Sequence, residues 1–219
     1  MGKNICKISK KKDVGSIGIG AMIVFIAMVL VAGIAASVLI QTSTTLESQA
    51  LSTGKETTAE VSSGLDVVNI EGYKSGAGTI DMLAIGIRPR AGSADIDLAQ
   101  TVIEISDSAT KNFLAYDDTT CTLAADVNGD LFAFAYYPTT ATKFTIIVLE
   151  DADGSCASAT SAVINSGDLV VLGVNTSSCF SGLSERDDVW GLVMPEEGSP
   201  GVLNFKCPPS FTDAVLELQ

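Results

Sequence analysis

Acidic residues at close spacing are the first feature of this sequence that could do chemistry. Asp126, Asn128 and Asp130 stand at alternate positions around a glycine, and residues 151–155 (DADGS) are a shorter version of the same pattern. Oxygen donors at this spacing are typical of loops that bind calcium. Neither cluster is followed by the glutamate that completes an EF-hand loop, and Asn-Gly and Asp-Gly are also common hairpin turns. A Ca²⁺ or Mg²⁺ site at Asp126, Asn128 and Asp130 and a plain turn are therefore both open.

Cysteines form the second group. Cys6 lies near the N-terminus, and the other four all follow residue 64, namely Cys121, Cys156, Cys179 and Cys207. Four thiols in an exported domain predict two disulfides, with three possible pairings that spacing alone does not rank. A zinc site is disfavoured because no two cysteines have the C-x-x-C spacing. Free, buried thiols are the main alternative.

One acceptor sequence for N-glycosylation occurs, at Asn175-Thr176-Ser177. It directly follows a predicted strand at 168–174, so we expect it in a surface loop, where Asn175 could carry a glycan.

Catalytic motifs are missing from the sequence. The chain has no histidine, which excludes histidine-based catalysis and histidine-ligated metals. It also has no G-x-S-x-G elbow, Walker loop or H-E-x-x-H helix. A net charge of −13 disfavours nucleic acid as a partner, because its phosphates require clustered lysine and arginine. We predict a protein that is no enzyme and requires no cofactor.

The element that organises the chain is an uncharged segment at 16–46, of which 16–40 is almost wholly apolar. At about 1.5 Å per residue, 25 helical residues reach roughly 38 Å, enough to cross a hydrocarbon core of about 30 Å. Five lysines precede it, at positions 3, 7, 10, 11 and 12, against the single acid Asp13. The net charge of residues 1–15 is +4. Because the whole chain carries −13, residues 16–219 carry −17. The lysines favour a cytoplasmic N-terminus, with the acidic remainder outside.

The same segment is unlike an ordinary secretory signal, which ends in a small-residue cleavage site after roughly 7–15 apolar residues. Here the small residues Gly15 and Ser16 lie on the lysine side of the apolar segment. Cleavage between them would remove a leader at 1–15 and leave the apolar helix as the new N-terminus. This arrangement is typical of class III, type IV pilin-like signals.

Residues 18–43 (GIGAMIVFIAMVLVAGIAASVLIQTS) closely resemble the N-terminal segment of archaellins, the archaeal flagellins that build the swimming filament. A weaker likeness continues through 64–98. The resemblance implies cleavage after Gly15 by a prepilin-peptidase-like protease, with Ser16 as the first mature residue. Archaellin leaders usually have lysine or arginine directly before the glycine, whereas Asp13 and Val14 intervene here. Gly20 stands where a pilin typically has glutamate, which favours an archaellin over an adhesive pilin.

Self-assembly is what the composition of this helix predicts. Ala32/Ala36 and Gly33/Ser37 have the small-xxx-small spacing that lets helices approach closely. Apolar residues surround the whole helix, which indicates burial on every side among copies of the same chain. The residues predicted to form this polymerisation surface are Ile23, Phe25, Ile26, Met28, Leu30, Val31, Gly33 and Leu39.

The rest of the chain predicts a polar helical extension from 41, ending near 62–64, and then a β domain. Short apolar or alternating segments are separated by glycine, aspartate, asparagine, serine and proline clusters. The predicted strands are 65–73, 79–89, 101–106, 112–116, 131–138, 143–150, 168–174, 189–195, 201–205 and 214–219. The fold class is therefore α+β: a leader at 1–15, a long hydrophobic helix at 16–63, and an all-β sandwich or barrel at 64–219. The resemblance implies that this β domain is immunoglobulin-like.

The function that the resemblance implies is that of a structural subunit of the archaellum, an extracellular filament rotated by a membrane motor. The implied partners are the chain itself, sister archaellins, the archaellum membrane motor, a prepilin-peptidase-like protease, an oligosaccharyltransferase and, for the precursor, the membrane. Two alternatives stay open: an adhesive type IV-like pilin, and a membrane-anchored extracellular binding or enzyme domain.

Overall fold

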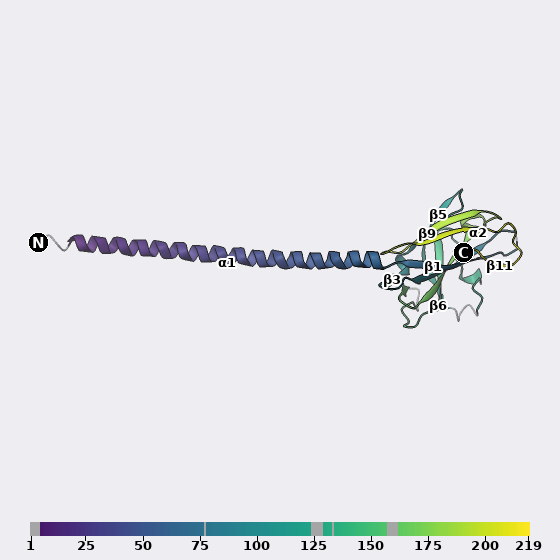
Figure 1. Cartoon of the computed structure of the whole chain (residues 1–219), viewed down its shortest axis with the longest axis horizontal. Helices are drawn as coiled ribbons and strands as arrows, with labels where there is room; N and C mark the ends of the chain where they lie inside the picture. The colour runs from purple at the N-terminus through teal and green to yellow at the C-terminus, as the bar shows by residue number, and fades with distance from the viewer. Residues whose placement is uncertain (1–4, 77, 124–128, 133, 157–161) are drawn as a thin grey trace. The chain divides into compact units, whose positions relative to one another are not determined.

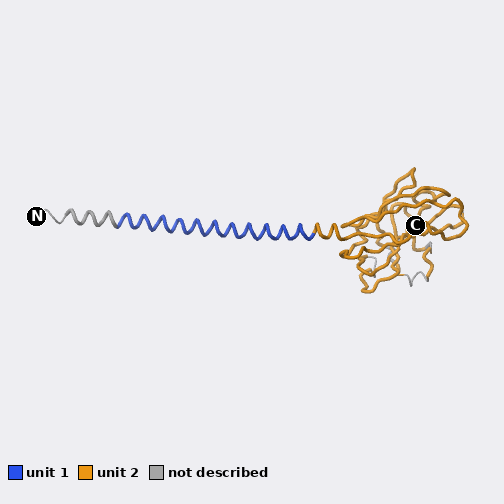
Figure 2. The backbone as a smooth tube through the Cα atoms, viewed as in Figure 1, with its two compact units in different colours: residues 1–55 blue, residues 56–219 orange. Residues whose placement is uncertain are grey.

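The computed structural model of the chain describes residues 5–76, 78–123, 129–132, 134–156 and 162–219. The chain divides into two compact units, residues 1–55 and residues 56–219 (Figure 2). Within the described residues, the first unit is a single helix and the strands all lie in the second.

Helix α1 spans Ile5–Ser62, which is 58 residues (Figure 1). It contains no proline, and alanine, leucine, methionine and isoleucine favour helix. Among the described residues it is the one helix long and apolar enough to cross a membrane, over Gly15–Ser62. The helix starts well before residue 16, where we expected it. Lysine and isoleucine are tolerated in helices and no proline intervenes, so helix formation propagates into the predicted leader.

Threonine hydroxyls in the polar part of α1 form hydrogen bonds to carbonyl groups of the same helix. Thr42 donates to the carbonyl of Leu39 at 3.0 Å, and Thr44 and Thr45 both donate to the carbonyl of Gln41, at 3.0 and 2.8 Å. Such bonds to the preceding turn satisfy the hydroxyl without water. The threonine-rich segment is thus compatible with helix even where neighbouring molecules would exclude solvent.

The second unit is built on one nine-stranded sheet, in the order β10-β9-β4-β5-β6-β8-β2-β1-β11, and a two-stranded sheet β3-β7. Its pairings are antiparallel except β5 with β6. Two 3₁₀ turns and one short helix join the strands: η1 (Leu98–Gln100), η2 (Phe134–Tyr136) and α2 (Thr176–Phe180). The strands are β1 (Leu65–Tyr73), β2 (Met82–Pro89), β3 (Ile96–Asp97), β4 (Val102–Ser106), β5 (Lys111–Leu123), β6 (Lys143–Glu150), β7 (Val163–Ile164), β8 (Leu169–Asn175), β9 (Asp188–Met194), β10 (Gly201–Lys206) and β11 (Val215–Glu217).

The large sheet curls so that strands from its two ends meet. Gly64, just before β1, forms an isolated bridge with Ser199, just before β10. The Leu65 amide donates to the Ser199 carbonyl at 3.1 Å, and the Ser199 amide donates to Ser63 at 2.9 Å. The main core fills the inside of this curl, and alternate residues of β10 point into it, including Leu203 and Phe205. The predicted fold class, α+β with a long hydrophobic helix followed by an all-β sandwich or barrel, is confirmed: one long apolar helix precedes a curled β-sheet domain.

A smaller apolar cluster lies on the opposite side of β2, β6 and β8, with Met82, Ile147 and Val171 among its members. Phe132 and Tyr137 cover it, with ring centroids 6.4 Å apart. We expected a strand at 131–138, and that prediction is wrong, because this segment contains η2 and turns. The aromatic side chains of this segment cover the smaller apolar cluster and do not alternate between the two sides of a sheet. The two-residue strands β3 and β7 and the short α2 were also not predicted.

Gly191 in β9 provides a test of the pairing between β4 and β9. A Cβ atom at this position would lie 2.1 Å from the carbonyl oxygen of Glu104. We expect Gly191→Ala to lower the free energy of unfolding by about 2 kcal/mol or more, because neighbouring backbone must move. Unfolding of the full chain in detergent can be followed by the fluorescence of its single tryptophan. Gly54→Ala in α1, where the added methyl meets no atom within 4 Å, is the control and should leave this transition unchanged. Equal stability of the two variants would contradict the close approach of the strands.

Candidate functional site

The predicted polymerisation residues lie on one continuous helix and are exposed to solvent in the single chain. Phe25 is 67% exposed, Met28 69% and Leu39 70%. An added Cβ at Gly33 would meet no atom within 4 Å, so the helix surface there is open. The other predicted members are 53 to 67% exposed, namely Ile23, Ile26, Leu30 and Val31. Apolar side chains are exposed on all sides of this segment in the single chain, and their burial is favourable.

Gly15 and Ser16, the predicted cleavage residues, lie within α1 and are exposed. No atom lies within 4 Å of a Cβ built on Gly15. Gly15 and Ser16 are therefore accessible, and cleavage between them stays a prediction.

The predicted cation loop is described only in part. Asp126 and Asn128 lie outside the described residues, and Asp130 is exposed. One carboxylate oxygen of Asp130 accepts a hydrogen bond from the Phe132 amide at 3.1 Å, the pattern of a simple aspartate turn.

A different set of carboxylates comes together at one end of β8. Oxygens of Asp151, Asp153 and Asp168 lie within 4.8 Å of one another. Asp168 is buried and accepts from the Asn165 amide at 2.9 Å. Hydrogen bonds from Ser155 and Asn165 hold the pKa of Asp153 below its usual value. Three carboxylates at this separation could hold a hard divalent cation such as Ca²⁺.

Asp168 was missed at the sequence level because it is distant in sequence from the pair at 151 and 153. The pairing of β6 with β8, in which Glu150 lies opposite Leu169, brings Asp168 close to Asp151 and Asp153.

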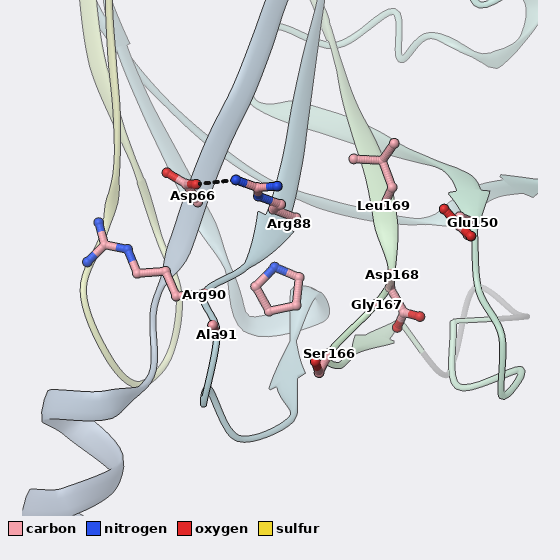
Figure 3. Close-up of a pocket in the computed structure, with 10 residues that line it drawn as sticks. Asp66, Arg88, Arg90, Ala91, Glu150, Ser166, Gly167, Asp168 and Leu169 are labelled. Atoms are coloured by element: carbon pink, nitrogen blue, oxygen red, sulfur yellow. Dashed lines mark hydrogen bonds and ion pairs between the residues drawn. The ribbon is translucent and has the colours of Figure 1, made fainter.

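A hollow in the second unit lies beside β1, β2 and β8 and has a volume of about 550 Å³ (Figure 3). Arg88 is turned toward Asp66, 3.2 Å away, and both side chains are about half exposed. Glu150 and Asp168 lie on the opposite side. The lining includes Ser166 and the carboxylates of Asp66, Glu150 and Asp168, but no lysine, cysteine or histidine. The exposed ion pair of Arg88 with Asp66 contributes at most about 1 kcal/mol to stability.

The two predicted disulfides are not both formed, because Cys179 and Cys207 are free thiols. Cys179 lies in the last turn of α2, and its thiol donates to the carbonyl of Ala141 at 3.3 Å, whereas Cys207 follows β10. Burial raises the pKa of each thiol to about 11, so both stay protonated at neutral pH. Cys156 is fully buried, and the side chain of Cys121 is outside the described residues. The alternative of free, buried thiols therefore holds for Cys207, whereas Cys179 is free and only partly buried.

The expected surface position of Asn175 is also wrong. Asn175 is the last residue of β8, is 6% exposed, and serves as the N-cap of α2. Its side-chain nitrogen, which a glycan would occupy, donates to the Pro138 carbonyl at 3.0 Å. Its side-chain oxygen accepts from Ser177 and from the Ser178 amide. The Asn-Thr-Ser sequence thus closes a strand-to-helix turn in this fold.

Replacing this cap should destabilise the β domain and leave glycosylation unaffected. Asn175→Ala removes a buried amide with three hydrogen bonds, so we expect a loss of about 1–3 kcal/mol in the free energy of unfolding. Asn204→Ala, at an exposed position of β10, is the control and should change stability by about 0.5 kcal/mol or less. Both are measured by urea unfolding of the full chain in detergent. Detection of a glycan on the peptide that contains Asn175, by mass spectrometry of cell-derived protein, would contradict this assignment.

Comparisons with known proteins agree on one family. The family model described as archaeal-type flagellin matches residues 15–205. Flagellin B2 of Methanocaldococcus jannaschii is 45% identical over 210 residues, covering 94% of this chain and 95% of that protein. Flagellin B1 of Methanococcus voltae is 41% identical over 216 residues, covering 97% of each.

Solved structures give the same result for the fold. The crystal structure of archaeal flagellin FlaB1 from Methanocaldococcus jannaschii is 36% identical, with a TM-score of 0.64, covering 72% of this chain and 97% of that one. The archaeal flagellum of Methanospirillum hungatei is 14% identical, also with a TM-score of 0.64, and covers 91% and 98%. With a matching family model over most of its length and relatives above 40% identity, this chain belongs to the archaeal flagellins, or archaellins.

Proposed function

We propose that this chain is a structural subunit of an archaellum filament and polymerises through the apolar part of α1, residues 16–46. The observation that carries the proposal is the exposure of large apolar side chains on all sides of that helix. Membership of the archaeal flagellin family supports a filament role over a membrane anchor or an enzyme.

The magnitude of the burial supports the same conclusion. Full burial of one large apolar side chain contributes about 1.5–3 kcal/mol relative to its exposed state. The seven large side chains of the predicted polymerisation surface together account for about 10–20 kcal/mol per subunit on this scale. Lipid provides this burial before assembly, and identical helices provide it afterwards. Contact on one side only, as in a dimer, would leave the opposite side of each helix in water.

Processing and export form the second part of the proposal. The precursor is held in the membrane by α1, with its lysine-rich start in the cytoplasm, and a prepilin-peptidase-like protease removes residues 1–15. The matured subunit then leaves the membrane for the base of an extracellular filament, alone or with sister archaellins, and the archaellum motor turns that filament. Support comes from the charge distribution around the apolar segment and from the small residues at 15 and 16.

A charge in the middle of the apolar segment should abolish assembly. Val31→Asp would bury an unpaired carboxylate among the packed helices, at a cost of several kcal/mol. We expect cells with this variant as their only archaellin to have no filaments in electron micrographs, while the β domain of the precursor unfolds as in wild type. Ser48→Asp, in the polar part of the same helix, is the matched control and should allow filaments. Normal filaments built from the Val31→Asp subunit would refute polymerisation through this segment.

Cleavage after Gly15 predicts the N-terminus of the assembled subunit. Protein sequencing of isolated filaments should give Ser16 as the first residue. Gly15→Leu should leave an uncut precursor in the membrane fraction, about 1.7 kDa larger than the mature subunit, because 15 residues remain attached. The matched control Gly18→Leu lies after the cut and should not retain the leader. A filament subunit that starts at Met1 or Gly2 would show that no such processing occurs.

A further inference from the structure

The side of strands β10, β9, β4 and β5 that points away from the core carries an unusual set of side chains. Strand alternation places the neighbours of these residues, among them Val189, Val193 and Leu203, in the core. On the outward side, three large apolar side chains are about half exposed: Phe113 at 54%, Trp190 at 45% and Val202 at 57%. We call the surface formed by Val102, Phe113, Trp190, Leu192 and Val202 the apolar face.

The register of the strands makes this face continuous. Phe113 and Leu192 both lie opposite Glu104, and Leu192 in turn lies opposite Val202. Trp190 is in the adjacent row, across from Ser106. Figure 1 shows β5 and β9 in the same part of the β domain. The solvent side of an antiparallel sheet is normally polar, and contiguous exposed apolar groups with aromatic residues are typical of an interface.

The charged groups that belong to this face neutralise one another. Lys111 is 2.5 Å from Glu104, and its ammonium group lies over the rings of Phe113 and Trp190, 5.5 and 5.3 Å from their centroids. At one end of strands β9 and β10, Lys206 of β10 pairs with Asp188 of β9 at 2.9 Å. The face therefore has a local net charge of zero, whereas residues 16–219 as a whole carry −17, the −13 of the chain less the +4 of its leader.

This contrast identifies the occupant. Identical subunits with a large negative charge repel one another wherever acidic surfaces approach. Two β domains can come into close contact only where the facing surface is neutral or complementary in charge. A neutral apolar surface on a strongly acidic domain meets that requirement, and a filament supplies copies of the same chain at close range.

We propose that the apolar face is the surface through which the β domain docks on a second copy of this chain. The inference rests on the proposed filament function and adds to it the place of contact between outer domains. In a helical array such a contact is head-to-tail, so the face meets a different surface of the neighbouring copy.

Trp190 provides a direct test, because it is the only tryptophan of the chain and lies within the face. Wild-type filaments and the detergent-solubilised full chain are compared by quenching with acrylamide. We expect the quenching constant to fall several-fold on assembly and the emission maximum to move to shorter wavelength. Filaments in which Trp190 is as accessible as in the monomer would overturn this inference alone. Failure of the wild-type chain to form filaments would instead refute the proposed function.

A pair of matched variants tests the same surface by assembly. Val202→Lys places a charge on the apolar face at edge strand β10, and Val215→Lys places it at β11, the other edge strand, where Val215 is 47% exposed. Each substitution makes the subunit less acidic, so greater overall repulsion cannot explain a loss. After detergent removal, we expect Val202→Lys to raise the critical concentration for filament formation about tenfold or more, through burial of an unpaired ammonium group. Val215→Lys should assemble as wild type does.

Three results would overturn the proposal. One is unchanged assembly of Val202→Lys, and the second is an equal loss in both lysine variants. The third is normal filaments from Val202→Lys whose attachment to solid surfaces is reduced, since the face would then bind foreign material. Tryptophan fluorescence of each variant in detergent checks that its β domain is folded, and Val202→Ser serves as a second, uncharged variant with a smaller expected loss.

Discussion

The structure depends on a helix that has nothing of its own to pack against. Apolar side chains lie on all sides of α1 along residues 16–46, and in the single chain all of them are exposed. An ordinary amphipathic helix buries one side on its own domain and keeps the other in water. Here no side is polar, so the segment is stable only in lipid or among other helices. The absence of catalytic groups fits this role, because the helix acts through the free energy of its burial.

The β domain is built to fold without help from that segment. Its core residues all come from strands and loops after residue 64, and the sheet curls so that Ser63 and Gly64 meet Ser199. The free thiol of Cys207 lies in the core as a small apolar group, and that of Cys179 packs against the core. The core of the β domain can therefore form without a contribution from the apolar segment of α1.

Elements with a strong repeating pattern were predictable from the sequence, and features made by distant residues were not. The apolar helix and most strands follow from composition and alternation, because local physics alone favours them. The segment 131–138 has the composition of a strand but covers a cluster whose other members lie on β2, β6 and β8. Asn175 matches a glycosylation acceptor, yet its partner Pro138 is 37 residues away. Asp168 joins Asp151 and Asp153 only through strand pairing. Such outcomes depend on tertiary contacts that a short sequence pattern does not contain.

Cohesion and register place different demands on a filament subunit. A helix that is apolar on every side gains free energy from any close neighbour, so it selects weakly among alternative offsets and rotations; small residues such as Ala32 and Gly33 set how closely helices approach. Specificity requires that wrong arrangements cost more than the correct one. An acidic domain surface supplies that cost, because most relative positions of two such domains bring like charges together. The apolar face is neutral because its charged residues form ion pairs, such as Lys111 with Glu104. An arrangement in which the subunits meet through this face therefore avoids the electrostatic repulsion. On this view the helix provides most of the binding free energy, and the charge pattern of the β domain selects the arrangement in which the subunits stack.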